Sequence, residues 1–271
     1  MYNLIAKLCT IRFGDYTNTK NGAHFSPNFK YFFVTYHLQK NCERFLYKPE
    51  KQNDMVINLG TENSILNQYM AELRDCQIQK DSMRFRRNLE RIGEIFAYEI
   101  SKQLDFVTTE VQTPLGVAQV PQLAAQPVIA SVLRAGLPIH YGFLNVFDKA
   151  ENAFISACRK YEKDGCTFHI NFDHIAGPST DGKTLILVDP MQASGSSMVL
   201  AYQALLKKGT PRHTHIVSVI SSREGLDFLQ RNTAGQPVTI WTGAIDDELT
   251  AKSYIVPGLG DAGDLCFGEK E

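Results

Sequence analysis

The sequence predicts an α/β fold in which a parallel sheet is flanked by helices. Short apolar strands alternate with helical segments along most of the 271 residues, and polar or charged residues directly follow several of these strands. Strands that alternate with helices are typical of a parallel sheet with right-handed crossovers. Ligands on such sheets bind beyond the carboxyl ends of the strands, so we expect a functional site at that edge.

The composition is that of an ordinary globular protein, with 44% apolar and 21% charged residues. A formal net charge of −1 gives no indication of a nucleic-acid partner. No apolar run is long enough to span a bilayer, and no charged start with an apolar segment marks a signal peptide. The six cysteines form no C-x-x-C pair, so we expect free thiols, no membrane association and a cytoplasmic location.

The N-terminal stretch, residues 1–54, differs from the rest. It carries eight Lys/Arg, four Asp/Glu and eleven of the 28 aromatic residues, without a helical or strand period. Three interpretations compete: a basic appendage that binds a partner, a floppy extension, or an upstream start assigned in error. We favour the last, because clear patterning begins at Met55, and we expect residues 55–271 to form the functional domain.

The first half of that domain predicts helices, a hairpin and a strand. Leu89, Ile92, Phe96 and Ile100 recur at helical spacing on one face of a helix. The Thr113–Gly116 turn separates two extended runs, which predicts a hairpin. The expected elements are helices over 64–76 and 82–104, a hairpin over 111–120, a strand over 127–133 and a helix over 137–147.

The second half predicts further alternation of strands and helices. One helix ends on Lys207-Lys208-Gly209, a basic last turn followed by a glycine stop. The expected elements are a strand over 153–158, a strand pair over 166–174, a strand over 185–188, a helix over 198–208, a strand over 215–220, a short helix over 225–231 and a last strand over 238–243.

The most informative stretch is residues 185–197. A short apolar strand ends at Asp189, small residues run from Ala193 to Ser197, and a helix is expected to open at Met198. Backbone N–H groups of such a loop and the helix N-terminus suit a sugar phosphate, while the carboxylate suits ribose hydroxyls. A plain connecting loop with Ser197 as the N-cap fits the same pattern. The spacing is neither that of a dinucleotide motif nor that of a P-loop.

Two arginines also follow strands of the expected sheet. Arg134 comes after the strand over 127–133, and Arg159 comes after the strand over 153–158. We therefore expect Arg134, Arg159 and Asp189 to meet at one mouth. Guanidinium groups stay charged and bind phosphate oxygens bidentately.

Three motifs together resemble the uracil phosphoribosyltransferase family. They are Asp189-Pro190-Met191 with the small-residue loop, Leu133–Leu137, and the tail Tyr254–Asp264 followed by Phe267-Gly268. The resemblance covers about residues 60–271, and the tail is its most specific part. It implies the type I phosphoribosyltransferase fold, a parallel sheet flanked by helices with a small hood that covers the base.

The resemblance implies transfer of the 5-phosphoribosyl group from phosphoribosyl diphosphate (PRPP) to uracil, which gives UMP and diphosphate in pyrimidine salvage. It implies catalytic roles for Arg159, Asp189 and Asp261. It implies no direct protein ligand to the metal, because Mg²⁺ would be held mainly through the diphosphate. The PRPP-binding residues that it implies are Arg134, Arg159, Asp189, Pro190, Met191, Gln192, Ala193, Ser194, Gly195, Ser196, Ser197 and Asp261.

The uracil end maps by resemblance to Ile255, Gly260, Asp261 and Ala262. Uracil offers two carbonyl acceptors and N–H donors, which a glycine-rich backbone can match at close range. The resemblance also implies a homo-oligomer, a dimer or larger, and GTP as a candidate activator. Two alternatives stay open: a phosphoribosyltransferase for another base, and a catalytically weak regulator that binds nucleotides.

The loop departs from the family pattern at three positions. Gln192 stands for Leu, Ser194 for Thr and Ser196 for Gly. Ser194 keeps the hydroxyl, whereas Ser196 would cost on the order of 1 kcal/mol if its backbone needed a positive φ. Residues 160–165 and the turn over 222–225 also differ from the family, which leaves the rate and the base preference open.

Two polar clusters and one further histidine have simpler explanations than a functional site. We expect His213 and His215 to be a surface pair at a strand edge, since no further ligand has suitable spacing. We expect His140 to be a hydrogen-bonded core histidine. We expect Asp246-Asp247-Glu248 to be a solvated helix start.

Overall fold

The computed structural model describes residues 56–161 and 168–269, with side chains described for 56–156 and 174–269. The expectation for residues 1–54 therefore lies outside the described residues. A seven-stranded sheet forms the centre in the order β1-β11-β9-β7-β4-β5-β6. All neighbours in it are parallel except β5 and β6, which are antiparallel, so the predicted parallel α/β class is confirmed.

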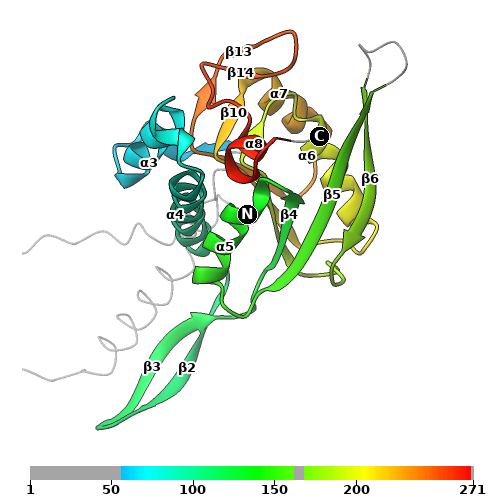
Figure 1. Cartoon of the computed structure of the whole chain (residues 1–271). Helices are drawn as coiled ribbons and strands as arrows, with labels where there is room; N and C mark the ends of the chain where they lie inside the picture. Colours follow the sequence, from blue (N-terminus) through cyan, green and yellow to red (C-terminus); the bar gives the residue numbers. More distant parts are fainter. Residues whose placement is uncertain (1–55, 162–167, 270–271) are drawn as a thin grey trace, which may run out of the picture. The chain divides into compact units, whose positions relative to one another are not determined.

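The elements follow the predicted alternation of strands and helices (Figure 1). They are β1 (Val56–Asn58), the short 3-10 turn η1 (Leu59–Thr61), α3 (Ile65–Arg74), η2 (Ile78–Lys80), α4 (Ser82–Ser101), β2 (Phe106–Thr113), β3 (Gly116–Leu123), β4 (Val128–Leu133), α5 (Gly136–Val146), β5 (Glu151–Tyr161), β6 (Phe168–Ala176), β7 (Thr184–Val188), β8 (Met191–Gln192), α6 (Ser196–Leu206), β9 (His213–Ser218), β10 (Ile220–Ser222), α7 (Arg223–Asn232), β11 (Val238–Thr242), β12 (Ile245–Asp246), β13 (Glu248–Leu249), β14 (Ile255–Val256) and α8 (Ala262–Phe267).

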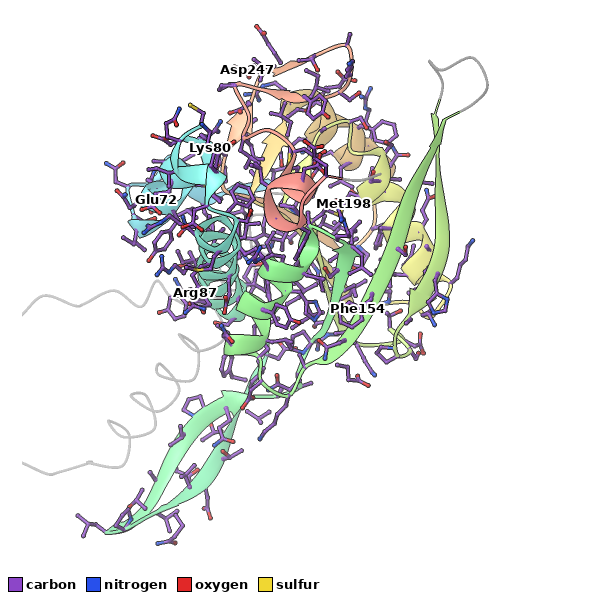
Figure 2. All side chains as sticks on the ribbon, viewed as in Figure 1. Glu72, Lys80, Arg87, Phe154, Met198 and Asp247 are labelled. Carbon is purple, nitrogen blue, oxygen red and sulfur yellow. The ribbon has the colours of Figure 1, made fainter. Side chains whose placement is uncertain are left out.

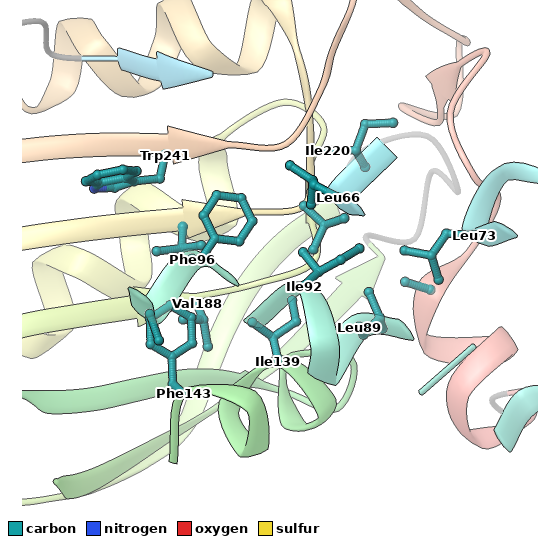
Figure 3. Packing of buried hydrophobic residues seen from close by; sticks show 14 of the residues in the cluster. Leu66, Leu73, Leu89, Ile92, Phe96, Ile139, Phe143, Val188, Ile220 and Trp241 are labelled. Atoms are coloured by element: carbon teal, nitrogen blue, oxygen red, sulfur yellow. The ribbon is translucent and has the colours of Figure 1, made fainter. Parts of the chain in front are cut away.

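Helices cover both faces of the sheet. Alternate residues of β7 point to opposite faces: Ile186 and Val188 pack with α4 and α5, whereas Leu185 and Leu187 pack with α6 and α7. The period of two in the strands thus divides the interior into two apolar clusters. Figure 3 shows the first cluster, in which Phe96 of α4 and Phe143 of α5 lie near Val188 of β7. None of the helices that the structure describes has both the length and the apolar character needed to cross a membrane.

Two helices on one face make direct backbone contact. A Cβ added at Gly142 of α5 would lie 2.1 Å from the carbonyl oxygen of Glu90, and one added at Gly93 of α4 would lie 2.6 Å from that of Ile139. Small residues at both positions therefore bring α4 and α5 together, which seats α5 and the loop before it against the sheet.

The hairpin β2–β3 projects from the body of the domain (Figure 1). It contains the predicted Thr113–Gly116 turn but is longer than the predicted 111–120. Several of its apolar side chains are exposed, and Figure 2 shows side chains standing away from the hairpin on both sides. The exposed apolar residues are Phe106, Val107, Leu115, Val117 and Val120.

Three details of the predicted pattern are wrong. Residues 168–176 form a single strand, β6, that pairs with β5, whereas a strand pair was expected over 166–174. His213 and His215 are not at a sheet edge, because β9 lies between β7 and β11. His215 is buried, and its Nδ1 accepts a hydrogen bond from Trp241 Nε1 at 3.1 Å.

The acidic run after β11 is the third correction. Asp246 lies on β12 and is buried, whereas a solvated helix start was expected there. His140 agrees with the sequence: it is buried, and its Nε2 lies 2.7 Å from Asn152 Oδ1. Burial lowers the pKa of His140, which outweighs the opposite effect of that hydrogen bond and keeps the ring neutral.

Candidate functional site

The carboxyl ends of β4 and β7 bring two predicted site residues to the same edge. The two strands are parallel neighbours, with Ser131 paired to Val188. Arg134 follows β4 and Asp189 follows β7, as the sequence predicts. Arg159 differs, because it lies within β5, which runs to Tyr161 and not to the predicted end at 158. Leu133 pairs with Ser156, so the backbone of Arg159 lies beyond the end of β4; its side chain is outside the described ones.

A small second sheet continues the central one beyond this edge. Strands β8, β10 and β12 come shortly after β7, β9 and β11, and they pair in parallel in the order β12-β10-β8. The Pro190 carbonyl also accepts hydrogen bonds from the N–H groups of Val219 and Ile220, at 3.0 and 3.1 Å. The start of the 189–197 loop is therefore fixed by neighbouring strands.

The loop then enters α6 at Ser196, two residues before the predicted helix start at Met198. Gly195 is the N-cap and has φ +76°, in the left-handed region that favours glycine. Ser253 is the only non-glycine residue with a positive φ in the described part of the chain. The question raised by Ser196 is thereby answered: the positive φ falls on Gly195, and Ser196 is an ordinary first helical residue.

The hydroxyl groups of this loop lie beside the α6 N-terminus. Ser194 Oγ and Ser196 Oγ are 2.7 Å apart, so one hydroxyl donates to the other. Both side chains are partly exposed, and so is Asp189. Hydroxyl groups, the backbone N–H groups of the first helical turn and the positive end of an eleven-residue helix together suit a phosphate group.

Gln192 has a structural side chain, although the sequence placed this residue among the PRPP contacts. It is buried; its Nε2 donates to the Gly225 carbonyl at 2.9 Å, and its Oε1 accepts from Ser218 Oγ at 3.3 Å. Both ends of the amide are therefore engaged with the protein. The Gln192 side chain ties the loop to α7, and a PRPP contact of this residue stays a prediction.

Sequence reasoning missed two residues that support the loop from α7. Ser222 Oγ donates to the Ala193 carbonyl at 2.5 Å and accepts from the Gly225 N–H at 2.8 Å. A Cβ on Gly225 would lie 2.1 Å from the Ala193 carbonyl oxygen. The turn over 222–225 was noticed only as a departure from the family pattern, and its final glycine was the available signal.

Arg134 joins the loop after β4 to the C-terminal tail. Its Nη2 donates to the Gly268 carbonyl at 3.1 Å and lies 3.8 Å from Asp264 Oδ1. Its Nε is buried and has no hydrogen-bond partner among the described residues. A buried donor with unused capacity in a cluster of polar groups is a candidate ligand contact. The predicted diphosphate arginine and the predicted base-binding tail therefore meet.

The tail from Tyr254 to Gly268 forms a turn and a short helix. Its first residues include strand β14, which pairs in antiparallel fashion with β13 just before the tail. Ile255 and Ala262 are buried, while Gly260 is exposed and has φ +86°. One carboxylate oxygen of Asp261 caps α8, accepting from the N–H groups of Gly263 and Asp264 at 2.8 and 3.1 Å. Three of the four predicted uracil residues, Gly260, Asp261 and Ala262, thus lie at the start of α8, whereas Ile255 lies on β14.

A further arginine holds the other end of α8. Arg86 Nη1 donates to the Cys266 carbonyl at 2.5 Å. Burial raises the pKa of the Cys266 thiol to about 12, so this group stays protonated and is no nucleophile. Nothing in the sequence distinguishes Arg86 from the other arginines of α4.

The mostly parallel sheet flanked by helices, with a small-residue loop after Asp189 and a glycine-rich tail, is that of a type I phosphoribosyltransferase. Within that class, the chain belongs to the uracil phosphoribosyltransferase family, whose model matches residues 60–269. The chain is 54% identical over 215 residues to the uracil phosphoribosyltransferase of Porphyromonas gingivalis, a match that covers 79% of this chain and 99% of that protein.

More distant proteins give the same result. The uracil phosphoribosyltransferase of Methanothermobacter thermautotrophicus is 39% identical over 210 residues, covering 76% of this chain and 93% of that protein. The solved structure of the AQ2163 protein from Aquifex aeolicus superimposes with a TM-score of 0.70 at 27% identity, covering 79% of this chain and 98% of that chain. Both sequence and fold are therefore shared across the domain.

Proposed function

We propose that this protein transfers the 5-phosphoribosyl group of PRPP to uracil, which gives UMP and diphosphate. One observation carries the proposal: Arg134, which follows β4 beside the Asp189 loop, donates to Gly268 of the base-binding tail. The expected sites for the two substrates therefore adjoin. Family membership, shared with proteins of that name over residues 60–269, gives the substrate pair.

The roles of the residues follow from their chemistry. The Ser194 and Ser196 hydroxyls and the start of α6 bind the ribose phosphate, and Asp189 accepts hydrogen bonds from the ribose hydroxyls. Arg134 and Arg159 stabilise the charge that develops on the leaving diphosphate, an electrostatic effect that is usually the largest in catalysis. Backbone groups of residues 255 and 260–262 orient uracil so that its N1 faces the ribose C1.

We propose Mg²⁺ as the cofactor, bound mainly through the diphosphate. Bound there, the ion neutralises charge on the leaving group. The partly exposed carboxylate of Asp189 is the type of oxygen ligand that Mg²⁺ prefers. No group of three or more metal-ligating side chains gathers within the part of the chain that the structure describes, so the proposal relies on substrate oxygens.

The test is an assay of purified full-length protein with Mg²⁺, PRPP and a panel of bases. We expect UMP from uracil and no nucleotide from the other bases. Turnover of another base in place of uracil would assign the protein a different substrate. Binding of PRPP without any turnover would instead favour a nucleotide-binding regulator and refute the proposed activity.

We further propose that the protein is a homo-oligomer in the cytoplasm and that residues 55–271 form its catalytic domain. The exposed apolar side chains of β2–β3 support pairing with a second copy, since a hairpin with two open apolar faces is marginal by itself. The free thiols of Cys76 and Cys266 suit a reducing compartment. Sedimentation of wild type and of Val117→Lys checks the pairing, which the added charge should weaken.

We also propose GTP as an activator, on the basis of the family resemblance. Initial rates measured with and without GTP, at subsaturating PRPP, test this directly. An unchanged rate would refute the role of GTP as an activator and would leave the proposed transferase activity standing.

A further inference from the structure

The ion pair between Arg74 and Asp246 lies next to the base-binding tail. Arg74 ends α3, and Asp246 lies on β12, far along the sequence. The pair is bidentate: Arg74 Nη1 and Nη2 each donate to one carboxylate oxygen of Asp246 at 2.8 Å. The Asp246 side chain is 8% exposed and that of Arg74 is 27% exposed. A buried, two-bond pair of this type has a fixed geometry, unlike a surface ion pair.

Both partners also hold the backbone of Gly258. Its N–H donates to Asp246 Oδ2 at 2.8 Å, and its carbonyl accepts from Arg74 Nη1 at 3.1 Å. The three residues thus form a closed ring of hydrogen bonds, which leaves neither backbone group of Gly258 unpaired in a buried position. Gly258 has φ +60°, and a Cβ there would lie 2.1 Å from the Ile255 carbonyl oxygen.

A second side chain from the same region holds the next residue. Gln79, in the short turn η2 that follows α3, donates from Nε2 to the carbonyls of Leu73 and Leu259, at 2.9 and 3.3 Å. The segment from α3 to η2 therefore donates hydrogen bonds to two consecutive residues of the tail, Gly258 and Leu259. These residues lie between Ile255 and Gly260, the first two positions of the expected uracil site.

The charge state of Asp246 agrees with this arrangement. Burial alone would raise the pKa of its carboxyl group, but hydrogen bonds from Arg74 and the Gly258 N–H, with the charge of Arg74, lower the pKa overall. The carboxylate is therefore ionised at neutral pH and accepts all of these hydrogen bonds.

We propose that Arg74 and Asp246 are positioning residues for the base: by fixing Gly258, they hold residues 255–262 in the conformation that receives uracil. The inference rests on the proposed transferase function. Without the pair, the tail would have to be ordered when uracil binds, and that cost would appear as weaker uracil binding. The PRPP loop has its own supports at Gln192 and Ser222, so its affinity should change little.

The experiment compares full-length wild type with Asp246→Asn and Arg74→Lys. Asn keeps the shape but removes the charge, and Lys keeps the charge but removes the fork of donors. We expect the KM for uracil to rise about tenfold in each variant, the scale of one lost charge-assisted hydrogen bond, with kcat at saturating uracil largely retained. The KM for PRPP should stay within about twofold, and the double variant should be no worse than the single ones.

The neighbouring residue provides a matched control. Asp247 also pairs with an arginine, Arg223, at 3.0 Å, but its side chain is 77% exposed, and Figure 2 labels it on the outer surface. Asp247→Asn makes the same chemical change one residue away and should leave both KM values unchanged.

Each result decides the matter. Equal rises in both KM values, or an unchanged KM for uracil, would overturn the positioning role. Loss of thermal stability and of PRPP binding in both variants would assign the pair to the fold as a whole and would also overturn it. Failure of the wild type to make UMP would instead refute the proposed function, so the two failures are distinguishable.

Discussion

Gly225 and Ala193 are in direct backbone contact, where the first turn of α7 meets the loop after β7. A Cβ on Gly225 would lie 2.1 Å from the Ala193 carbonyl oxygen, and the Ser222 hydroxyl donates to that same oxygen at 2.5 Å. The first turn of α7 therefore shapes the loop that is proposed to bind the ribose phosphate.

Replacing this glycine should impair PRPP binding. In Gly225→Ala the added methyl group forces residues 193–195 to move, so we expect the KM for PRPP to rise about tenfold or more. The KM for uracil should change less. Initial rates at varied PRPP measure the effect, and Gly116→Ala, where an added Cβ meets nothing within 4 Å, is the matched control. An unchanged KM for PRPP would show that the loop tolerates the shift.

Replacing Asp189 should weaken the binding of PRPP far more than the binding of uracil. Asp189→Asn keeps the size of the side chain but removes its charge, so hydrogen bonds from ribose hydroxyls weaken. We expect the affinity for PRPP, measured by calorimetry, to fall about tenfold, and the KM for uracil to change much less. Equal losses for both substrates would refute the role assigned to Asp189.

The contact between α4 and α5 should contribute to the stability of the fold and not to substrate binding. In Gly142→Ala the new methyl group would meet the Glu90 carbonyl oxygen at 2.1 Å, so the helices must separate. We expect the free energy of unfolding, measured with urea, to fall by about 1–3 kcal/mol. The KM values should stay close to those of the wild type. Gly116→Ala again serves as the control, and equal stability of the two variants would contradict the prediction.

Acid should weaken the fold partly through Asp246. Its pKa in the folded protein lies below its ordinary value of 3.8, so its contribution to stability is complete above that value and is lost as the pH falls through the folded-state pKa. Unfolding free energies measured from neutral pH down to about pH 3 should therefore fall less steeply for Asp246→Asn than for the wild type.

The control for this pH series is Asp247→Asn, which changes an exposed carboxylate. Its curve should run parallel to that of the wild type throughout the acid range. A parallel curve for Asp246→Asn as well would mean that protonation of Asp246 does not contribute to acid unfolding.

Several features of the fold were predictable because they depend on local patterns. The apolar runs of β4 and β7 indicated buried parallel strands, and the Thr113–Gly116 turn indicated the hairpin. The order of strands and helices then placed Arg134 and Asp189 at one edge of the sheet. Strand lengths were less predictable: β5 continues past Arg159 because it pairs with β6, and that pairing leaves no local signal.

The orientation of individual side chains was not predictable at the same level. Gln192 reads as a loop residue, yet it is buried because β8 pairs with β10 and turns its amide toward Ser218 and Gly225. In the sequence His215 and Asp246 resemble surface residues, yet both are buried. His215 lies on β9, between β7 and β11, whereas Asp246 lies on the edge strand β12, where its carboxylate pairs with Arg74 and the Gly258 N–H. In each case, the partner comes from a distant segment.

The sequence by itself determined the α/β class, the strand–loop–helix motif at 185–197 and the family resemblance of the tail, because these depend on spacing within short segments. The tertiary structure decided what supports them. Arg74 and Asp246 are 172 positions apart, and Ser222 and Ala193 are 29 apart. Contacts over such separations have no periodic signature, since they depend on how the strands are ordered in the sheet and on which residues that order brings together.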